Sequence, residues 1–127
     1  MDIKKLVMKE EVPLINTPYE LATKIAEFLE EKKAKDIKII DLKGKTIVSD
    51  YFVVCSATST TQVKALAEYV DEKLSKEYAL EPRGRDFDNK WVAVDYNSVI
   101  LHVFHYEMRE FYNLERLWDD GDNIVSI

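Results

Sequence analysis

The sequence predicts a single α/β domain in which helices pack on a mixed, mostly five-stranded sheet. A chain of 127 residues fits one domain and leaves no room for two. Segments with a helical spacing of apolar residues alternate with short apolar runs that are typical of strands. Their order is helix, two strands, helix, three strands, helix, which indicates both parallel and antiparallel neighbours in one sheet.

The first predicted helix follows an amino-terminal arm. Residues 1–16 lack periodicity and form that arm. Thr17 can cap a helix, Pro18 suits its first position, and Glu20 completes a capping box. Apolar residues then recur on one helical face, at Leu21, Ile25, Phe28 and Leu29. A strand is expected next over residues 36–42, where apolar and polar residues begin by alternating.

A central strand and a second helix follow. Residues 50–57 are mostly apolar and rich in β-branched and aromatic side chains, so both faces of this strand should be covered. Ser59 and Gln62 form a second capping box. The helix behind it repeats apolar residues on one face, at Val63, Leu66, Ala67, Val70 and Leu74.

The last part of the domain predicts three strands and a short helix. An edge strand is expected after Pro82. Strands over 91–95 and 99–104 are joined by a short turn and should form an antiparallel hairpin. A helix is expected over 107–117, and residues 124–127 form a frayed tail or a small edge contact. The predicted organisation is an arm over 1–16, the domain over 17–118 and a tail over 119–127.

Composition and charge restrict the function classes. The single cysteine, Cys55, lies in an apolar run and cannot form an internal disulfide, which favours a reducing compartment. No run approaches the ~18–20 apolar residues of a membrane span, and no signal-peptide core is present, so a cytoplasmic protein is expected. The net charge of −6 argues against binding to a phosphate backbone. Residues 86–122 hold nine acids and three bases, which indicates either an acidic face for a basic partner or a plain solvated surface.

The sequence predicts no metal, no cofactor and no catalytic residue. His102 and His105 are three residues apart, which puts their side chains on opposite faces of a strand. His102 instead suits a half-buried position with both ring nitrogens satisfied. Asp86 and Asp88 have the spacing of a Mg²⁺-binding pair, but they lie in an expected turn. No phosphate-binding glycine loop or nucleophile elbow is present.

Aromatic residues gather toward the carboxyl terminus. Seven of the 14 lie between residues 91 and 118. Core packing accounts for some of them. Strand alternation nevertheless puts Trp91, Ala93 and Asp95 on one sheet face, and Val92 and Val94 on the other. The valine face suits a core, whereas the mixed face has the character of a docking surface.

An ordered set of short motifs spans about residues 18–118. It comprises Lys33 to Ile37, Asp41-Leu42, Ser49 to Val54, Ser59, Gln62-Val63, Trp91, Asp95-Tyr96, Val99, His102 to Phe104, Arg109, Tyr112, Leu114-Glu115 and Leu117-Trp118. In this order the motifs resemble those of the ribosomal silencing factor family, also called Iojap-like. One departure is Asn97-Ser98 in the hairpin turn, where Gly-Asp is common in the family.

The resemblance implies a protein that docks and does not catalyse. Its fold would have the outline of a nucleotidyltransferase without the catalytic residues. It would bind the large ribosomal subunit through ribosomal protein fourteen, block joining of the small subunit, and repress translation under nutrient limitation. Family members are often homodimers. Two alternatives stay open, a large-subunit assembly factor that uses the same docking surface and a divergent nucleotidyltransferase.

The mixed strand face and the family motifs together predict the partner-binding residues. They are Trp91, Asp95, Tyr96, His102, Phe104, Arg109 and Tyr112. The first three are expected to be direct contacts and the next three to be their neighbours. Tyr112, like Leu114 and Trp118, either shapes the surface or seats the last helix.

Overall fold

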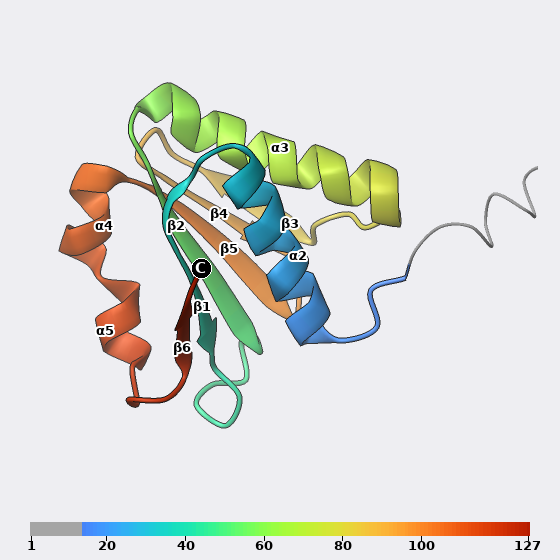
Figure 1. Ribbon diagram of the computed structural model, residues 1–127, viewed down its shortest axis with the longest axis vertical. Helices are drawn as coiled ribbons and strands as arrows, with labels where there is room; N and C mark the ends of the chain where they lie inside the picture. Colours follow the sequence, from blue (N-terminus) through green and yellow to red (C-terminus); the bar gives the residue numbers. More distant parts are fainter. Residues whose placement is uncertain (1–13) are drawn as a thin grey trace, which may run out of the picture.

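The computed structural model of the protein describes residues 14–127, so most of the expected amino-terminal arm lies outside the described residues. In this part of the chain, a six-stranded sheet has two long helices against one face and two short helices against the other (Figure 1). The predicted α/β fold with a mixed sheet is confirmed. The elements are α2 (Pro18–Glu31), β1 (Lys35–Asp41), β2 (Tyr51–Ala57), α3 (Thr60–Tyr78), β3 (Gly84–Phe87), β4 (Trp91–Asp95), β5 (Val99–His105), α4 (Tyr106–Tyr112), α5 (Leu114–Trp118) and β6 (Ile124–Ser126).

The strands follow the order β3-β4-β5-β2-β1-β6. Among the described strands, β2 and β5 pair in parallel and the other neighbours pair antiparallel. All seven residues of β2 are buried, as its apolar run predicted. β4 and β5 form the predicted hairpin, in which Trp91 lies opposite Phe104 and Ala93 lies opposite His102. β3 is an edge strand, also as predicted.

Local side-chain bonds explain where the two long helices begin. The Thr17 hydroxyl accepts a hydrogen bond from the backbone N–H of Glu20 at 3.1 Å. The Ser59 hydroxyl accepts one from the backbone N–H of Gln62 at 3.1 Å. Each satisfies an amide that has no partner within the helix. The Glu20 carboxylate accepts in turn from the N–H of Asn16, one residue ahead of the cap.

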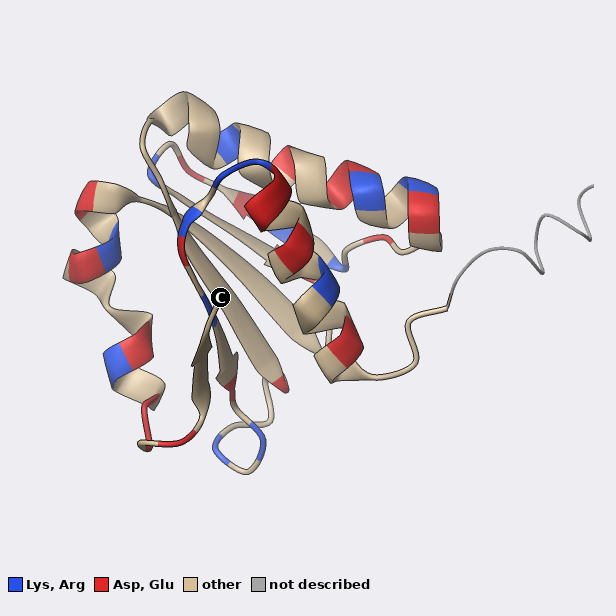
Figure 2. Ribbon diagram, viewed as in Figure 1, with Lys and Arg blue, Asp and Glu red and all other residues tan. Residues whose placement is uncertain are grey.

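Helices cover both faces of the sheet, so the described residues form two apolar cores. The larger core lies between the sheet and helices α2 and α3. The smaller core lies on the other face, beside α4 and α5. Its buried members are Ile40, Leu42, Phe52, Val54 and Phe104, with Trp91, Ile100, Met108, Leu114, Trp118 and Ile124 packed against them. The charged residues lie mainly on the helices and loops around these cores (Figure 2).

The helix expected over 107–117 is interrupted and forms two short helices. At Asn113 the backbone turns to a φ of 22°, which a continuous helix does not allow. The Asn113 amide closes α4 by donating to the Arg109 carbonyl at 3.0 Å, and its side-chain oxygen begins α5 by accepting from the Arg116 N–H at 3.2 Å. Helical spacing continued through this position in the sequence, so it did not reveal the break.

The sheet has six strands rather than the five expected, because the chain returns to the sheet after α5. Of the two alternatives for residues 124–127, the edge contact is found: β6 pairs with Lys38, Ile39 and Ile40 of β1. The Asn123 side chain donates to the carbonyl oxygens of Asp41 and Trp118 at 3.0 and 2.7 Å. These bonds fix the direction in which the chain enters β6.

Candidate functional site

Arg109 holds α4 against the sheet. Its side chain is buried and makes three hydrogen bonds. It donates to the Glu115 carboxylate at 2.6 Å, to the Ser56 hydroxyl at 2.8 Å and to the Asp36 carbonyl at 2.7 Å. These partners belong to α5, β2 and β1. One guanidinium therefore ties both short helices to the two strands beside them.

An aromatic cluster lies between α4 and the sheet. The Trp91 ring stacks on the Phe104 ring with 4.8 Å between ring centroids. The ring of Tyr112, a residue of α4, also lies with its centroid 4.8 Å from that of Trp91. The Trp91 indole N–H donates to Nδ1 of His102 at 3.1 Å. Stacking and this hydrogen bond together fix the orientation of a half-buried tryptophan.

His102 is buried more deeply than the sequence predicted. Because Nδ1 accepts from Trp91, the proton of the neutral ring lies on Nε2. This Nε2 is buried without a hydrogen-bond partner, and the Phe52 ring lies edge-on with 4.6 Å between ring centroids. The expectation that both nitrogens are satisfied therefore holds for Nδ1 alone. Burial lowers the pKa of His102 to about 4, so the ring remains a neutral acceptor for Trp91 near neutral pH.

A groove with a volume of about 390 Å³ opens beside Trp91. Its lining residues are Asp86, Asp88, Lys90, Trp91, Ala93, Met108 and Tyr112. Helix α4 adds three exposed aromatic side chains next to it: Tyr106 is 57% exposed, Phe111 77% and Tyr112 46%. We call the groove and these three residues the α4 surface. Four exposed acids lie in or beside it: Asp86 and Asp88 line the groove, and Glu107 and Glu110 belong to α4.

Asp95 and Tyr96 lie at the other end of β4 from Trp91. The Asp95 carboxylate bonds to the Arg83 guanidinium at 2.9 Å and to the Asn97 N–H at 2.7 Å. Tyr96 is buried in the larger core, and burial raises the pKa of its hydroxyl. Asn97 has a φ of 75°, a left-handed conformation that asparagine tolerates. Asparagine therefore takes the positive φ of this turn without a glycine.

The structure separates the seven predicted partner-binding residues by burial. Tyr96, His102, Phe104 and Arg109 are buried, Trp91 and Asp95 are half-buried, and Tyr112 is exposed. His102, Phe104 and Arg109 support the surface from beneath, whereas Tyr96 belongs to the larger core on the other face of the sheet. Sequence reasoning did not select Phe111, the most exposed aromatic residue of α4. Helical spacing shows that Phe111 shares a side with Met108, but Met108 packs on the smaller core while Phe111 faces outward.

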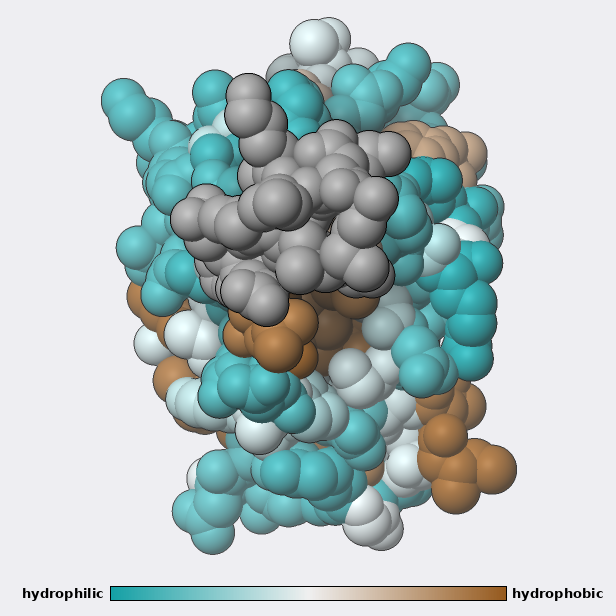
Figure 3. All heavy atoms as spheres, turned by 90° about the vertical axis from the view of Figure 1, so that its right-hand side faces the viewer, coloured by the Kyte–Doolittle hydropathy of each residue, from teal (hydrophilic) through white to brown (hydrophobic). Residues whose placement is uncertain are grey.

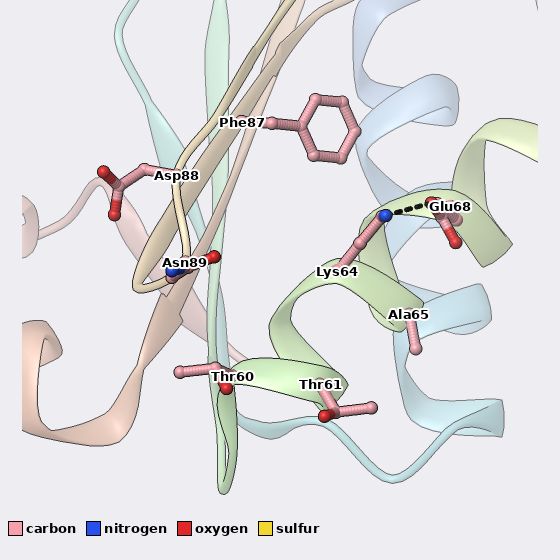
Figure 4. Close-up of a pocket in the computed structure, with 8 residues that line it drawn as sticks. All are labelled: Thr60, Thr61, Lys64, Ala65, Glu68, Phe87, Asp88 and Asn89. Carbon is pink, nitrogen blue, oxygen red and sulfur yellow. Dashed lines mark ion pairs between the residues drawn. The ribbon is translucent and has the colours of Figure 1, made fainter.

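A larger and shallower hollow of about 750 Å³ lies on the other side of the β3–β4 hairpin. Figure 4 shows the Phe87 ring projecting from the hairpin toward α3, where Lys64 pairs with Glu68 at 3.8 Å. Thr60 and Thr61 form its floor at the start of α3. All eight lining residues are exposed. This hollow is an open surface depression, in contrast to the groove held by packed aromatic rings.

The remaining surface offers fewer features that suggest a site. Within residues 14–127, no three His, Cys, Asp or Glu side chains gather in a way that could hold a metal ion. None of the helices in that part of the chain combines the length and the hydrophobicity of a membrane span. The face opposite α4 and α5 is mostly hydrophilic outside its grey atoms, with a few separate hydrophobic spots (Figure 3).

Comparisons with known proteins agree on one family. The family model described as "Ribosomal silencing factor during starvation" matches residues 15–126. The ribosomal silencing factor RsfS of Bacillus subtilis is 38% identical over 93 residues, which cover 72% of this chain and 79% of the relative. The mouse protein named "Mitochondrial assembly of ribosomal large subunit protein 1" is 32% identical over 99 residues, 74% of this chain and 43% of that protein.

Solved structures show the same fold. A crystal structure of a Chromobacterium violaceum protein superposes with a TM-score of 0.76 at 32% identity, over 81% of this chain and 87% of that one. A Bacillus halodurans protein superposes with a TM-score of 0.72 at 31% identity, over 86% and 99% of the two chains.

Proposed function

The chain belongs to the ribosomal silencing factor family, and from this premise we propose that it binds the large ribosomal subunit through ribosomal protein fourteen. Bound there, it blocks joining of the small subunit and represses translation when nutrients are scarce. It acts by occupying space and not by chemistry, in keeping with relatives that are named as silencing factors. Homodimerisation stays a prediction of the family resemblance, and a cytoplasmic location stays a prediction from the sequence.

The observation that carries this proposal is the α4 surface. It combines exposed aromatic side chains, which are typical interface hot spots, with a groove whose shape is fixed by Trp91 and Tyr112. Because Arg109, Phe104 and His102 hold this surface from beneath, little side-chain freedom is lost when a partner binds.

The charge around the α4 surface indicates a basic partner. Asp86, Asp88, Glu107 and Glu110 are exposed beside it. Proteins that bind ribosomal RNA carry many basic residues because they neutralise phosphates. Acids around an aromatic centre speed and orient association with such a protein. Acidic residues that the bound partner leaves uncovered would repel RNA phosphates and so also oppose approach of the small subunit.

Co-sedimentation with purified large subunits tests the proposal. Phe111→Ser removes an exposed ring that the core does not need, and Trp91→Ala removes the wall of the groove. Loss of a hot spot costs roughly 2 kcal/mol of binding, which corresponds to an affinity about 30-fold weaker. Phe87→Ser, at a phenylalanine that is 46% exposed on the α3 side of the hairpin, is the matched control. Unchanged affinity in folded Phe111→Ser and Trp91→Ala variants would reject the α4 surface as the docking site.

A second candidate function, assembly of the large subunit, is favoured by the name of the mouse relative. It would use the same α4 surface, so the two functions differ in the particle that is bound. An assembly factor sediments with immature large-subunit particles, whereas a silencing factor sediments with mature ones. Comparing both particle populations on one gradient therefore separates the two functions.

A further inference from the structure

The loop between β1 and β2, residues 42–50, carries two adjacent exposed side chains that are β-branched. Ile47 is completely exposed and Val48 is 59% exposed. Leu42 at the start of the loop and Ser49 near its end are buried, so both ends of the loop are fixed. A pair of adjacent apolar side chains held away from the core costs solubility without adding to the stability of the fold. We call residues 42–50 the Ile47 loop.

Several bonds hold the Ile47 loop in one shape. The Asp41 carboxylate accepts from the Lys43 N–H at 2.9 Å, and the Thr46 hydroxyl accepts from the Val48 N–H at 3.2 Å. The Lys45 N–H donates to the Leu42 carbonyl at 2.9 Å, and the Lys45 ammonium pairs with Asp120. Ile47 is therefore presented by a preorganised loop, which lowers the entropy lost when a partner covers it.

The charge around the Ile47 loop is acidic. The turn at residues 119–122 lies against it through the Lys45–Asp120 ion pair. Loop, turn and the adjoining strand ends hold two lysines and five aspartates, which are Asp41, Asp50, Asp119, Asp120 and Asp122. Both lysines are engaged, Lys45 by Asp120 and Lys43 above the Tyr51 ring at 4.9 Å. Such a site attracts a basic protein and repels nucleic acid and anionic lipid.

The Ile47 loop and the α4 surface lie at opposite ends of the parallel strands β2 and β5, because the loop leads into Tyr51 and α4 begins directly after His105. From α4 the chain runs through α5 to the acidic turn, and the loop lies beyond that turn (Figure 1). Figure 2 shows the acidic colour of the turn next to the basic residues of the loop. Leu117 in α5, also exposed, lies in the chain between α4 and this turn. Because α5 and the acidic turn connect the two places along one face of the sheet, one large partner can span both.

We propose that the Ile47 loop is a second anchor, which inserts Ile47 and Val48 into an apolar pocket on a basic protein of the large ribosomal subunit. This inference rests on the proposed function, because it takes the same particle as partner. It adds a contact that the α4 surface does not make, at the opposite end of α5. The two anchors together fix the orientation of the protein on the subunit. A protein held by a single patch could still rotate about that patch.

Site-specific photo-cross-linking on purified large subunits tests the second anchor. A benzoyl-phenylalanine is placed at position 47, at position 112 in the α4 surface, or at the exposed position 76 of α3 as a control. We expect position 47 to form an adduct with a basic ribosomal protein and position 76 to form none. An adduct of position 47 with RNA, or none while position 112 reacts, overturns the second anchor and leaves the proposed function standing. If the protein neither cross-links at position 112 nor co-sediments with the subunits, both the second anchor and the proposed function are rejected.

Binding measurements give an independent test. The double variant Ile47→Ser with Val48→Ser should keep the melting temperature of the wild type, because neither side chain belongs to a core. Its affinity for large subunits should fall at least fivefold. Val125→Ser, at an exposed β-branched residue of β6, is the matched control and should stay within twofold of the wild type. A double variant that binds within twofold of the wild type overturns the inference.

Discussion

Replacing Arg109 tests how the α4 surface is held. Arg109→Met keeps much of the side-chain volume but removes the three hydrogen bonds to Glu115, Ser56 and Asp36. Removing one partner of a buried ion pair costs about 3–5 kcal/mol. Glu115 keeps Lys38 at 3.7 Å and is partly exposed, so we expect the lower end, about 3 kcal/mol.

Urea unfolding measures this loss directly, and a melting curve should shift by about 10 °C for a domain of this size. Arg116→Met, at an exposed arginine of α5, is the matched control and should change the free energy of unfolding by about 0.5 kcal/mol or less. Arg109→Lys should lie between the two, because an ammonium cannot reach three partners at once. If Arg109→Met unfolds within about 1 kcal/mol of the wild type, Arg109 does not hold the helices.

Three further predictions concern single residues. Asn113→Ala should destabilise the protein by about 1 kcal/mol or more in urea unfolding, and Asn113→Gly by only a few tenths, because glycine tolerates a positive φ where alanine does not; equal losses would contradict the cap. Because the pKa of His102 falls from 6.5 to about 4 on folding, the unfolded chain alone gains a proton between these values. The free energy of unfolding should then fall with decreasing pH across that window by about 3 kcal/mol more than in His102→Gln, and parallel curves would refute it. Burial raises the pKa of the Cys55 thiol to about 12, so an alkylating reagent at about pH 8 should label it only after unfolding, and rapid labelling of the native protein would be the contrary result.

Local sequence signals predicted the parts of the fold that depend on neighbouring residues. The caps at Thr17 and Ser59 act over three residues, so their patterns located the two long helices. The uniform apolar run of β2 likewise indicated a strand that is covered on both faces. Strand alternation placed Val92 and Val94 in a core and Trp91 on the other face, as the structure shows.

Features that depend on distant residues could not be read in this way. Alternation does not reveal that α4 folds back over the Trp91 face, since that position is fixed by the Arg109 contact with Ser56, 53 residues away in the chain. Without knowledge of this Arg109–Ser56 contact, the side of α4 that faces outward and the exposure of Phe111 cannot be predicted. β6 has three residues, too few for a periodic signal, and it is held by Asn123 reaching back to Asp41 across 82 residues.

The most direct test of the central claim is subunit joining measured by light scattering, with purified large and small subunits and increasing amounts of the protein. We predict that the wild type lowers the fraction of joined ribosomes in proportion to its occupancy of the large subunit. At the same concentration, Phe111→Ser should leave the fraction of joined ribosomes as it is without the protein. Phe87→Ser should inhibit joining like the wild type. Full joining in the presence of wild-type protein that occupies the large subunit would contradict the account.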